Sequence, residues 1–382
     1  MSSLVDYEVV IIGAGAVGLA IAKELQENQC KSVIILEKNS NFGQETSSRN
    51  SQVIHSGIFN DINSKKFQFC IEGKNLLYSF LRKYNLEFEQ TEKIIVSKDS
   101  ENQAFNKFVN EITKKGISFS KISKQELSKI EPNVKSSNSL IIHDSGIFDA
   151  HMYMHQLYQI ANLSHDFLFN AKVSDIKFSD SYFTTNIVEG SGNMSKIKSK
   201  FLINCAGLES FNLSKRLMGN SLSIPNLRFF KGSYFKLSSV YRNQFKKLIY
   251  SLPSNEDSLG IHISFDEQKI PRLGPDYNEV FLKDGVFDYS VKYDSATSFF
   301  ESAKDYIKNL NEEDLSADFS GIRPKLFVNG NSKSEFYIKE ESDNGFPGLI
   351  NLIGIDSPGL TSSLAIARSV KNIMLNNLTV DE

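Results

Sequence analysis

Cysteine and long apolar runs are both scarce in this chain of 382 residues. Its three cysteines form no Cys-x-x-Cys pair and no even framework, which excludes a disulfide scaffold and fits free thiols in a reducing compartment. The longest apolar stretch, Val9 to Ala22, is too short for a membrane span, and no basic segment of the signal-peptide type precedes it. We therefore expect a cytoplasmic protein without a transmembrane segment, and peripheral contact with the inner face of the membrane stays open.

An excess of charge of either sign is missing as well. The 43 Lys and Arg residues nearly balance the 45 Asp and Glu residues, which leaves a formal net charge of −2. The two signs are interspersed, so no basic surface for nucleic acid is expected. The length exceeds the roughly 250–300 residues at which single cores stop growing. The sequence therefore predicts two domains and no nucleic-acid partner.

A glycine-rich turn near the start carries the strongest signal. An apolar run over residues 8–12 is typical of a buried strand, and it leads into Gly13-Ala-Gly15-Ala-Val-Gly18 and an amphipathic helix pattern. Gly13 permits the tight turn, Gly15 lets the backbone approach a pyrophosphate, and Gly18 lets the helix pack closely on the strand. The amides that open the helix then face the phosphates, which predicts a dinucleotide site.

An acidic residue lies where such a site needs one. A second apolar strand, residues 32–36, ends in Glu37. A carboxylate at this point can accept hydrogen bonds from both hydroxyls of a ribose, and it disfavours a 2′-phosphate. NADP is therefore not expected, and FAD and NAD remain.

The rest of the chain alternates between helix and strand patterns. Helices are expected over residues 64–84 and 101–115, a buried strand over 201–205, and a last strand and helix over 349–353 and from Thr361 onward. Residues 221–295 carry the alternating, aromatic-rich runs of an antiparallel sheet.

These patterns predict an α/β fold: a Rossmann-like nucleotide-binding domain with an inserted, β-rich (α+β) substrate domain. The nucleotide domain is discontinuous. Its predicted parts are residues 1–85, 140–220 and 315–382, and the substrate domain takes residues 86–139 and 221–314.

Several segments resemble the FAD-dependent D-amino-acid-oxidase-like superfamily and, within it, the L-2-hydroxyglutarate dehydrogenase/oxidase family. The matching segments follow one another in the family's order: Glu45–Phe59, Lys231–Tyr234, Gly260–His262, Arg272–Asp276, Gly321–Pro324 and Gly354–Ser363. The resemblance implies FAD as the cofactor and a nucleotide domain of the glutathione-reductase type. It also implies oxidation of L-2-hydroxyglutarate or a relative to the 2-oxo acid.

One loop departs from the family pattern. The family commonly has two tyrosines after its His-x-Gly motif, whereas this chain has Phe59 and Asn60. The next residues, Asp61 to Asn63, lack the Pro-Gly that is usual there. If those tyrosines shape the substrate pocket, the substrate differs from 2-hydroxyglutarate.

The glycine turn, the ribose acid and the resemblance together give a set of cofactor-binding residues. An amide-rich turn before the last helix is expected to hold the pyrimidine edge of the flavin, where the helix dipole adds roughly 0.3–1 kcal/mol. No metal site is expected. The predicted FAD ligands are Gly13, Gly15, Ala16, Val17, Gly18, Glu37, Lys38, Thr46, Ser47, Ser48, Arg49, Asn50, Ser51, Val173, Ala206, Gly207, Gly354, Pro358, Gly359, Leu360 and Thr361.

Oxidation of a 2-hydroxy acid needs a carboxylate clamp and a base for the hydroxyl proton. Arg323 is the predicted clamp, because a guanidinium fork matches a carboxylate and its segment resembles the superfamily's substrate-binding arginine. His55 and His262 compete as the base, since an ordinary histidine titrates near neutral pH. Lys231 is a candidate for a second carboxylate, and Tyr234 lies three positions further along the same strand.

Two other functions remain open from the sequence. An amine or amino-acid oxidase would use Arg323 in the same way and would need no base for a hydroxyl proton. A non-catalytic FAD-binding subunit is the third alternative. The acceptor that reoxidises the flavin, whether oxygen, a quinone or a carrier protein, has no motif in the chain.

Overall fold

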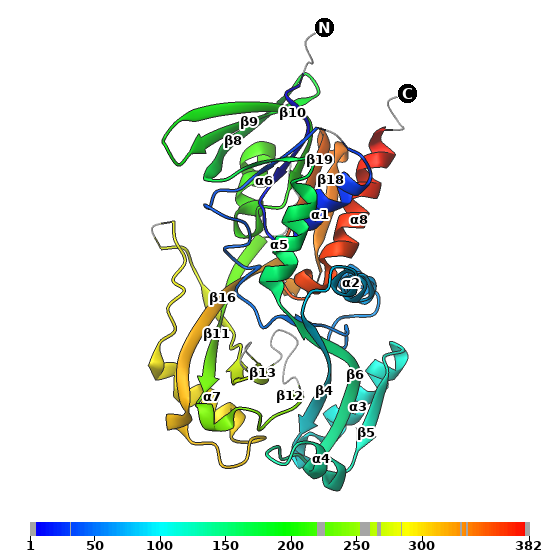
Figure 1. Cartoon of the computed structure of the whole chain (residues 1–382), viewed down its shortest axis with the longest axis vertical. Helices are drawn as coiled ribbons and strands as arrows, with labels where there is room; N and C mark the ends of the chain where they lie inside the picture. Colours follow the sequence, from blue (N-terminus) through cyan, green and yellow to red (C-terminus); the bar gives the residue numbers. More distant parts are fainter. Residues whose placement is uncertain are drawn as a thin grey trace.

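The computed structural model describes residues 5–30, 32–219, 226–252, 260–265, 269–283, 285–328, 331–333 and 335–378. Its α-helices are α1 (Ala16–Glu27), α2 (Lys65–Lys83), α3 (Asn102–Lys114), α4 (Lys124–Ile130), α5 (Ala150–Ala161), α6 (Ser210–Met218), α7 (Ala296–Ala303) and α8 (Gly359–Leu378). Its strands belong to two sheets that lie at the two ends of an elongated molecule (Figure 1).

The first sheet contains eight of the described strands, in the order β18-β19-β10-β1-β2-β7 with β9 and β8 beside β10. Strands β1, β2, β7, β10 and β19 run parallel, whereas β8, β9 and β18 are attached antiparallel. The bounds are β1 (Tyr7–Ile12), β2 (Val33–Leu36), β7 (Asp166–Leu168), β8 (Ala171–Ser179), β9 (Tyr182–Glu189), β10 (Met194–Asn204), β18 (Tyr337–Glu341) and β19 (Phe346–Ile353).

Both faces of this sheet are covered, because successive side chains of a strand point to opposite faces. Val9 and Ile11 of β1 pack in one core with helices α1, α5 and α8. Val10 and Ile12 pack in a second core with α6 and the β8–β9 pair. A sheet buried on both sides explains why β1 and β2 are continuous apolar runs.

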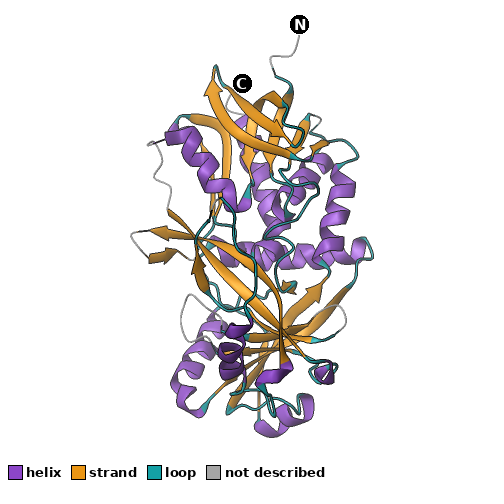
Figure 2. Ribbon diagram, turned by 90° about the vertical axis from the view of Figure 1, so that its left-hand side faces the viewer, coloured by secondary structure: helices purple, strands orange, loops and turns teal. Residues whose placement is uncertain are grey.

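The second sheet contains eleven of the described strands, in the order β17-β16-β11-β14-β13-β12-β4-β6-β3, with β15 beside β11 and β5 beside β6. Its pairs are antiparallel except β12 with β4. Figure 2 shows helices on the side of this sheet away from the first one. The bounds are β3 (Val53–Ile54), β4 (Phe88–Ser97), β5 (Phe119–Ile122), β6 (Asn138–Phe148), β11 (Asn226–Leu237), β12 (Leu248–Ser251), β13 (His262–Phe265), β14 (Pro271–Gly274), β15 (Asn278–Val280), β16 (Leu315–Val328) and β17 (Asn331–Lys333).

The predicted α/β class, with a parallel nucleotide-type sheet and a second β-rich part, is confirmed. Within the predicted β-rich stretch, residues 221–225, 253–259, 266–268 and 284 lie outside the described residues. The division into two domains stays a proposal. Strands β6 and β16 pair within the second sheet, so a division by sheets would give residues 140–148 and 315–328 to the substrate part.

Candidate functional site

The glycine turn lies between the end of β1 and the start of α1. Gly13 has φ +102°, and a Cβ there would lie 2.5 Å from the carbonyl oxygen of Cys205, so only glycine fits this turn without strain. Gly15 is the N-cap of α1 and offers no side-chain oxygen to the helix. The Ala16 amide donates instead to Ser47 Oγ at 3.0 Å. The opening turn of α1 is therefore held by a loop that follows β2.

Glu37 lies at the end of β2 and is buried. Its carboxylate accepts hydrogen bonds from the amides of Ala14 and Asn39, both at 2.9 Å. Burial raises the pKa of the Glu37 carboxyl, and these two amide bonds oppose that effect. Each carboxylate oxygen has further acceptor capacity, so the group can stabilise the turn and still accept bonds from a ribose.

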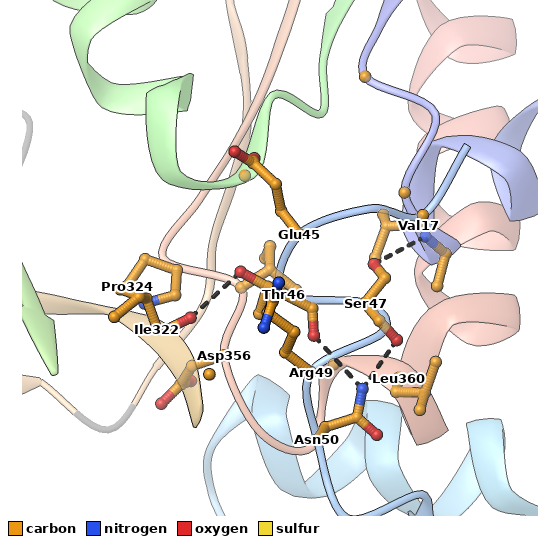
Figure 3. Close-up of a pocket in the computed structure, with 18 of the residues that line it drawn as sticks. Val17, Glu45, Thr46, Ser47, Arg49, Asn50, Ile322, Pro324, Asp356 and Leu360 are labelled. Carbon is orange, nitrogen blue, oxygen red and sulfur yellow. Dashed lines mark hydrogen bonds between the residues drawn. The ribbon is translucent and has the colours of Figure 1, made fainter. Parts of the chain in front are cut away.

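The segment after Glu37 connects the two sheets across the site (Figure 3). Thr46 Oγ1 donates to the carbonyl of Ile322 at 3.1 Å, which ties the segment to β16. Asn50 Nδ2 donates to the carbonyls of Thr46 and Ser47, which closes a tight loop. The Arg49 guanidinium lies over the Tyr289 ring, 4.4 Å from its centroid. These contacts place one face of the segment along the cavity.

The last predicted cofactor element is the turn from β19 into α8. Pro358, Gly359 and Leu360 line the cavity at the start of α8. Gly354 has φ +70° and packs against Leu326, so it shapes the turn and does not line the cavity. Thr361 also lies outside the lining: its hydroxyl donates to the Val53 carbonyl at 3.3 Å and accepts from the His55 amide at 3.2 Å.

These elements, which come from both sheets, line one continuous cavity. Most of the predicted cofactor ligands line it, from Gly13 and Glu37 at the first sheet to Asn50 and Ser51 near the second. Ser48 does not; its hydroxyl donates to the carbonyl of Glu45 at 3.0 Å. Residues of the matching segments that were not predicted as ligands, Gln52, Pro275 and Asp356 among them, also contribute to the lining.

Both candidate bases line the same cavity. His262 is buried, and its Nδ1 lies 3.2 Å from the Gly260 carbonyl. Its Nε2 has no hydrogen-bond partner among the described residues. A carbonyl can only accept, so Nδ1 carries the proton and Nε2 presents a lone pair. His55 Nε2 lies 3.3 Å from Ser357 Oγ. Burial lowers the pKa of His262 to about 3 and that of His55 well below its ordinary value.

Arg323 projects from β16 into the cavity lining. Its Nη2 donates to the backbone carbonyl of Asp276 at 3.2 Å. Gly232, on the neighbouring strand β11, leaves the space that the guanidinium occupies. Among the residues that the structure describes, no carboxylate forms an ion pair with Arg323, which keeps most of its fork available to a ligand.

The two predicted residues of β11 lie in different surroundings. Tyr234 is buried, lines the cavity, and stacks on Phe319 at 4.4 Å between ring centroids. Lys231 is not part of the lining. Its Nζ donates to the Ser290 carbonyl and lies 3.7 Å from the carboxylate of Asp288. This placement does not support Lys231 as a cation for the substrate.

Sequence reasoning missed a lysine near the two histidines. Lys93 of β4 is fully buried, and its Nζ has no hydrogen-bond partner. Lys93 directly precedes the apolar run Ile94-Ile-Val96, and a lysine at such an edge is usually exposed, so its burial had no clear signal in the sequence.

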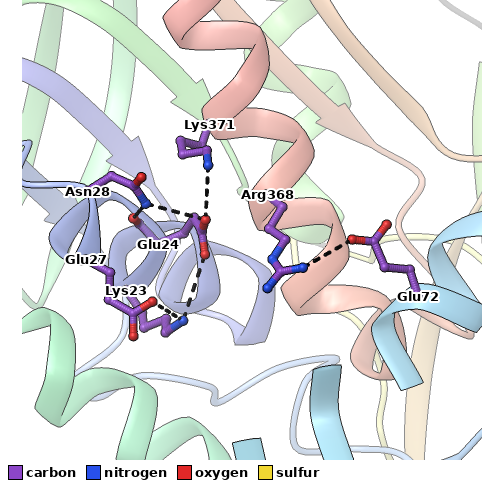
Figure 4. Close-up of polar contacts among 7 residues, drawn as sticks. All are labelled: Lys23, Glu24, Glu27, Asn28, Glu72, Arg368 and Lys371. Atoms are coloured by element: carbon purple, nitrogen blue, oxygen red, sulfur yellow. Dashed lines mark hydrogen bonds and ion pairs between the residues drawn. The ribbon is translucent and has the colours of Figure 1, made fainter. Parts of the chain in front are cut away.

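The helices behind the cavity are fixed to each other by ion pairs (Figure 4). Lys371 of α8 lies 3.5 Å from the buried carboxylate of Glu24 in α1, and Arg368 lies 3.7 Å from Glu72 of α2. Gly73 lets α2 approach α8, since a Cβ there would lie 2.5 Å from the Thr361 carbonyl. Because α1 and α8 both begin at the cavity, this packing fixes the distance between its two helix starts.

Comparison with known proteins shows the family to which this chain belongs. The family model described as FAD dependent oxidoreductase (DAO) matches residues 8–372. The chain belongs to this family, and its cofactor is FAD. It is similar to a mitochondrial L-2-hydroxyglutarate dehydrogenase of Arabidopsis thaliana, with 33% identity over 96% of this chain and 83% of the relative. It is also similar to an L-2-hydroxyglutarate dehydrogenase of Indibacter alkaliphilus, at 26% over 96% and 98%.

Solved structures share the fold. An L-α-glycerophosphate oxidase from Mycoplasma pneumoniae with FAD bound has a TM-score of 0.83 at 22% identity, covering 96% of this chain and 94% of that one. A glycine oxidase from Geobacillus kaustophilus has a TM-score of 0.80 at 18% identity, covering 97% and 95%. The residues present fit the cofactor, because the cavity joins a glycine turn, a buried ribose-type carboxylate and the start of α8.

The described part of the chain has neither a candidate membrane-spanning helix nor a candidate metal cluster. Its helices include none with the length and hydropathy of a membrane span. It contains no cluster of three or more histidine, cysteine, aspartate or glutamate side chains suited to a metal ion.

Glu37→Ala should weaken FAD binding by roughly 1.5–3 kcal/mol, the usual value of hydrogen bonds to a charged group. The measurement is a titration of the apoprotein with FAD, followed by flavin fluorescence. Glu37→Gln is the matched control, because it retains an acceptor for the turn amides and loses the charge. Unchanged affinity in the alanine variant would remove Glu37 from the cofactor site.

Proposed function

We propose that this FAD-dependent oxidoreductase oxidises a small 2-hydroxy acid, L-2-hydroxyglutarate or a close relative, to the 2-oxo acid. One observation carries the proposal: an arginine fork and two uncharged imidazoles line the cavity that receives the cofactor elements. The names of the similar dehydrogenases support the same substrate class. When bound, FAD supplies the hydride acceptor.

Arg323 orients the substrate in this proposal. Its guanidinium forms a bidentate, charge-assisted contact with the carboxylate at C1, which fixes the adjacent C2 carbon. The Asp276 carbonyl holds one edge of the guanidinium and leaves the other edge to the substrate. Gly232 keeps the arginine close to the sheet, so the fork is positioned before the substrate arrives.

A histidine takes the hydroxyl proton as the hydride leaves C2. His262 suits this step, because the Gly260 carbonyl fixes its tautomer and its Nε2 lone pair is unpartnered. His55 lines the same cavity and is also uncharged, so it stays the second candidate. After transfer the imidazolium holds the former hydroxyl proton on Nε2, and the C2–O bond becomes the carbonyl of the 2-oxo acid.

An amine or amino-acid oxidase is the second candidate function, and the fold shared with glycine oxidase favours it. Arg323 would clamp the amino acid in the same way. The two functions differ in the need for a base, since an amine loses its proton before hydride leaves. A 2-hydroxy acid needs a base for its hydroxyl proton, and His262 Nε2, which has no partner among the described residues, can serve as that base. An amine substrate gives this nitrogen no role.

The electron acceptor of the flavin and the cellular compartment are also part of the proposal. Oxygen, a quinone or a carrier protein would each reoxidise the flavin, and reoxidation rates with each acceptor would separate them. A reducing compartment such as the cytoplasm is supported by the three cysteines, which are free thiols. Similar enzymes include mitochondrial ones, so fractionation of the source cells is the direct test.

Anaerobic reduction of the bound flavin tests the function itself. Purified holoenzyme is mixed with a panel of L- and D-2-hydroxy acids, amino acids and glycerol 3-phosphate, and bleaching of the flavin spectrum is followed. Rapid bleaching by L-2-hydroxyglutarate or a relative is expected. Bleaching by amino acids alone would favour the oxidase, and bleaching by glycerol 3-phosphate alone would also overturn the proposal.

Arg323→Ala should raise the Michaelis constant for the 2-hydroxy acid roughly 30-fold or more, because a charge-assisted contact to the substrate carboxylate is lost. The FAD content should stay unchanged. Arg242→Ala, which removes an exposed guanidinium that does not line the cavity, is the control and should show wild-type kinetics. Normal kinetics for Arg323→Ala would discard the clamp.

Loss of the catalytic base should slow flavin reduction roughly 10²- to 10⁴-fold and leave the FAD spectrum intact. We expect this for His262→Ala or for His55→Ala, measured by anaerobic stopped flow. The variant that keeps the wild-type rate identifies the histidine that is not the base. Wild-type rates in both variants would leave the amino-acid oxidase as the better function.

The pH profile follows from the charge state of the base. The sequence alone places the acid limb near the ordinary histidine pKa, but burial lowers the pKa of both histidines. The active, uncharged form is therefore present above the lowered pKa, and activity is lost only as the pH falls through it. We expect the acid limb of flavin reduction below pH 6.5, the ordinary histidine pKa. A limb at or above that value would contradict the buried environment.

A further inference from the structure

Lys93 lies on β4 next to an irregularity in the sheet. The pairing of β4 with β6 shifts register between Thr91 and Lys93, and such bulges re-aim side chains. Lys93 is 0% exposed, and within the described part of the chain its Nζ has no hydrogen-bond partner. The neighbouring Glu92 pairs with His143 and Lys247 instead. A buried group with three donors and no acceptor therefore lies inside the second sheet.

Aromatic rings surround this ammonium. Its Nζ lies 4.2 Å from the centroid of the Tyr250 ring and 5.9 Å from that of Phe59. Ring faces attract a cation, but they do not satisfy its N–H donors. Among the residues that the structure describes, no carboxylate hydrogen-bonds to Lys93 or shifts its pKa. A buried, unpaired ammonium costs free energy, and a bound anion beside Nζ would offset that cost.

His262 links Lys93 to the substrate cavity. Its ring stacks on Tyr250 at 3.8 Å between centroids, and it lines the cavity. The positive charges of Lys93 and Arg323 both lower the pKa of His262, so both cations act on the same imidazole. Lys93 also acts on His55. The candidate base is thus flanked by the arginine clamp and by a second cation.

We propose that Lys93 is the second anchor of the substrate site and binds the distal carboxylate of a dicarboxylic 2-hydroxy acid. The inference rests on the proposed function and specifies its substrate. Arg323 would hold the carboxylate next to C2, the histidine would face the hydroxyl, and Lys93 would hold the other end. Lys93 is not among the lining residues, but its Nζ lies over the Tyr250 ring, on which the lining residue His262 stacks. Its flexible four-carbon stem would let Nζ turn toward an anion in the cavity.

Anion binding is coupled to the charge of this lysine. Burial lowers the pKa of Lys93 to about 7, so above that pH the free enzyme holds a partly neutral amine. A carboxylate beside Nζ favours the charged form and raises the pKa again. Binding of a dicarboxylate above pH 7 should therefore take up a proton.

The first test uses the holoenzyme without any substitution. Anaerobic flavin reduction is compared for L-2-hydroxyglutarate, its neutral 5-amide and L-2-hydroxypentanoate, which differ only at the distal end. The dicarboxylate should have a kcat/KM roughly 10- to 100-fold higher than either neutral analogue, as expected for hydrogen bonds to a charged group. Equal values for the three compounds would overturn the proposal.

The second test locates the anchor. Lys93→Met should remove most of the preference for the dicarboxylate, measured as the ratio of kcat/KM for L-2-hydroxyglutarate to kcat/KM for L-2-hydroxypentanoate. Lys231→Met is the competing variant, and Lys304→Met removes an exposed ammonium of α7 as the control. Loss of the preference in Lys231→Met but not in Lys93→Met would overturn the assignment. An equal loss on both substrates in Lys93→Met would also overturn it, since that marks a general effect on the histidines.

Glutarate provides a readout that is independent of turnover. Its binding is followed by perturbation of the flavin spectrum, and calorimetry at pH 8 in buffers of different ionisation enthalpy counts the protons taken up. Wild type should take up protons, and Lys93→Met should bind glutarate weakly with less uptake. Glutarate binding that Lys93→Met leaves unchanged would overturn the anchor.

Two further outcomes are also decisive. If no 2-hydroxy acid reduces the flavin but glutarate binding depends on Lys93, the proposed function fails and the anchor stands. If Lys93→Met does not fold as a holoenzyme, Lys93→Arg retains the charge in a different shape, and the proton uptake of wild type decides. Absence of uptake there would overturn the proposal.

Discussion

The register of three parallel strands is the constraint on which the cavity depends. Ile12 of β1 lies opposite Asn204 of β10, and Asn204 lies opposite Asn351 of β19. Asn204 Nδ2 donates to Asn351 Oδ1 at 3.0 Å, and Asn351 Nδ2 donates to Glu341 Oε1 at 2.9 Å. A buried polar network of this kind is satisfied in one alignment only, so it resists any slip of the strands.

That alignment brings three distant parts of the chain to one edge. The glycine turn follows β1, Ala206 follows β10, and the turn into α8 follows β19. Ligands of open α/β sheets bind outside the carboxyl ends of the strands, and the cavity lies at that edge. A slip of β19 by one residue would move the start of α8 away from the glycine turn and would place apolar side chains on the wrong face.

The second half of the site is fixed by contact with the segment after β2. A Cβ at Gly321 would collide with the backbone of Arg49, so β16 and this segment approach more closely than any other residue would permit. The bond from Thr46 to Ile322 holds the same approach. Arg323 follows two positions after Gly321 on the same strand, and its reach into the cavity depends on this contact.

Local motifs were predictable from the sequence because their causes are local. The turn at Gly13 and the acid at the end of β2 each depend on a few adjacent residues, and the structure has them. The parallel strands were predictable because burial on both faces makes them continuous apolar runs. The family is confirmed by comparison, whereas the role of each site residue stays a prediction.

Positions that depend on long-range pairing were not predictable. The alternation of a strand does not reveal which cation faces the cavity: Lys231 is bound by Asp288 and Ser290, which come from a segment far along the chain. The burial of Lys93 depends on a bulge between β4 and β6 and on the pairing of β4 with β12. Thr361 was predicted as an FAD ligand at the start of the last helix, but α8 begins two residues earlier and the Thr361 hydroxyl bonds to β3.

The Arg323 guanidinium gives the substrate end of the cavity its preference for anions. The imidazoles of His55 and His262 lose their charge on burial, so they offer lone pairs without adding positive charge. Arg323 retains its charge, because a guanidinium is not deprotonated in proteins. A carboxylate that binds beside Arg323 therefore meets its guanidinium and the uncharged imidazoles, and its charge in turn stabilises any proton that a histidine receives. Burial lowers the pKa of each imidazole in the free enzyme. When the anionic substrate lies beside the imidazole, its charge raises that pKa again, and the effect is larger in a buried site than in water.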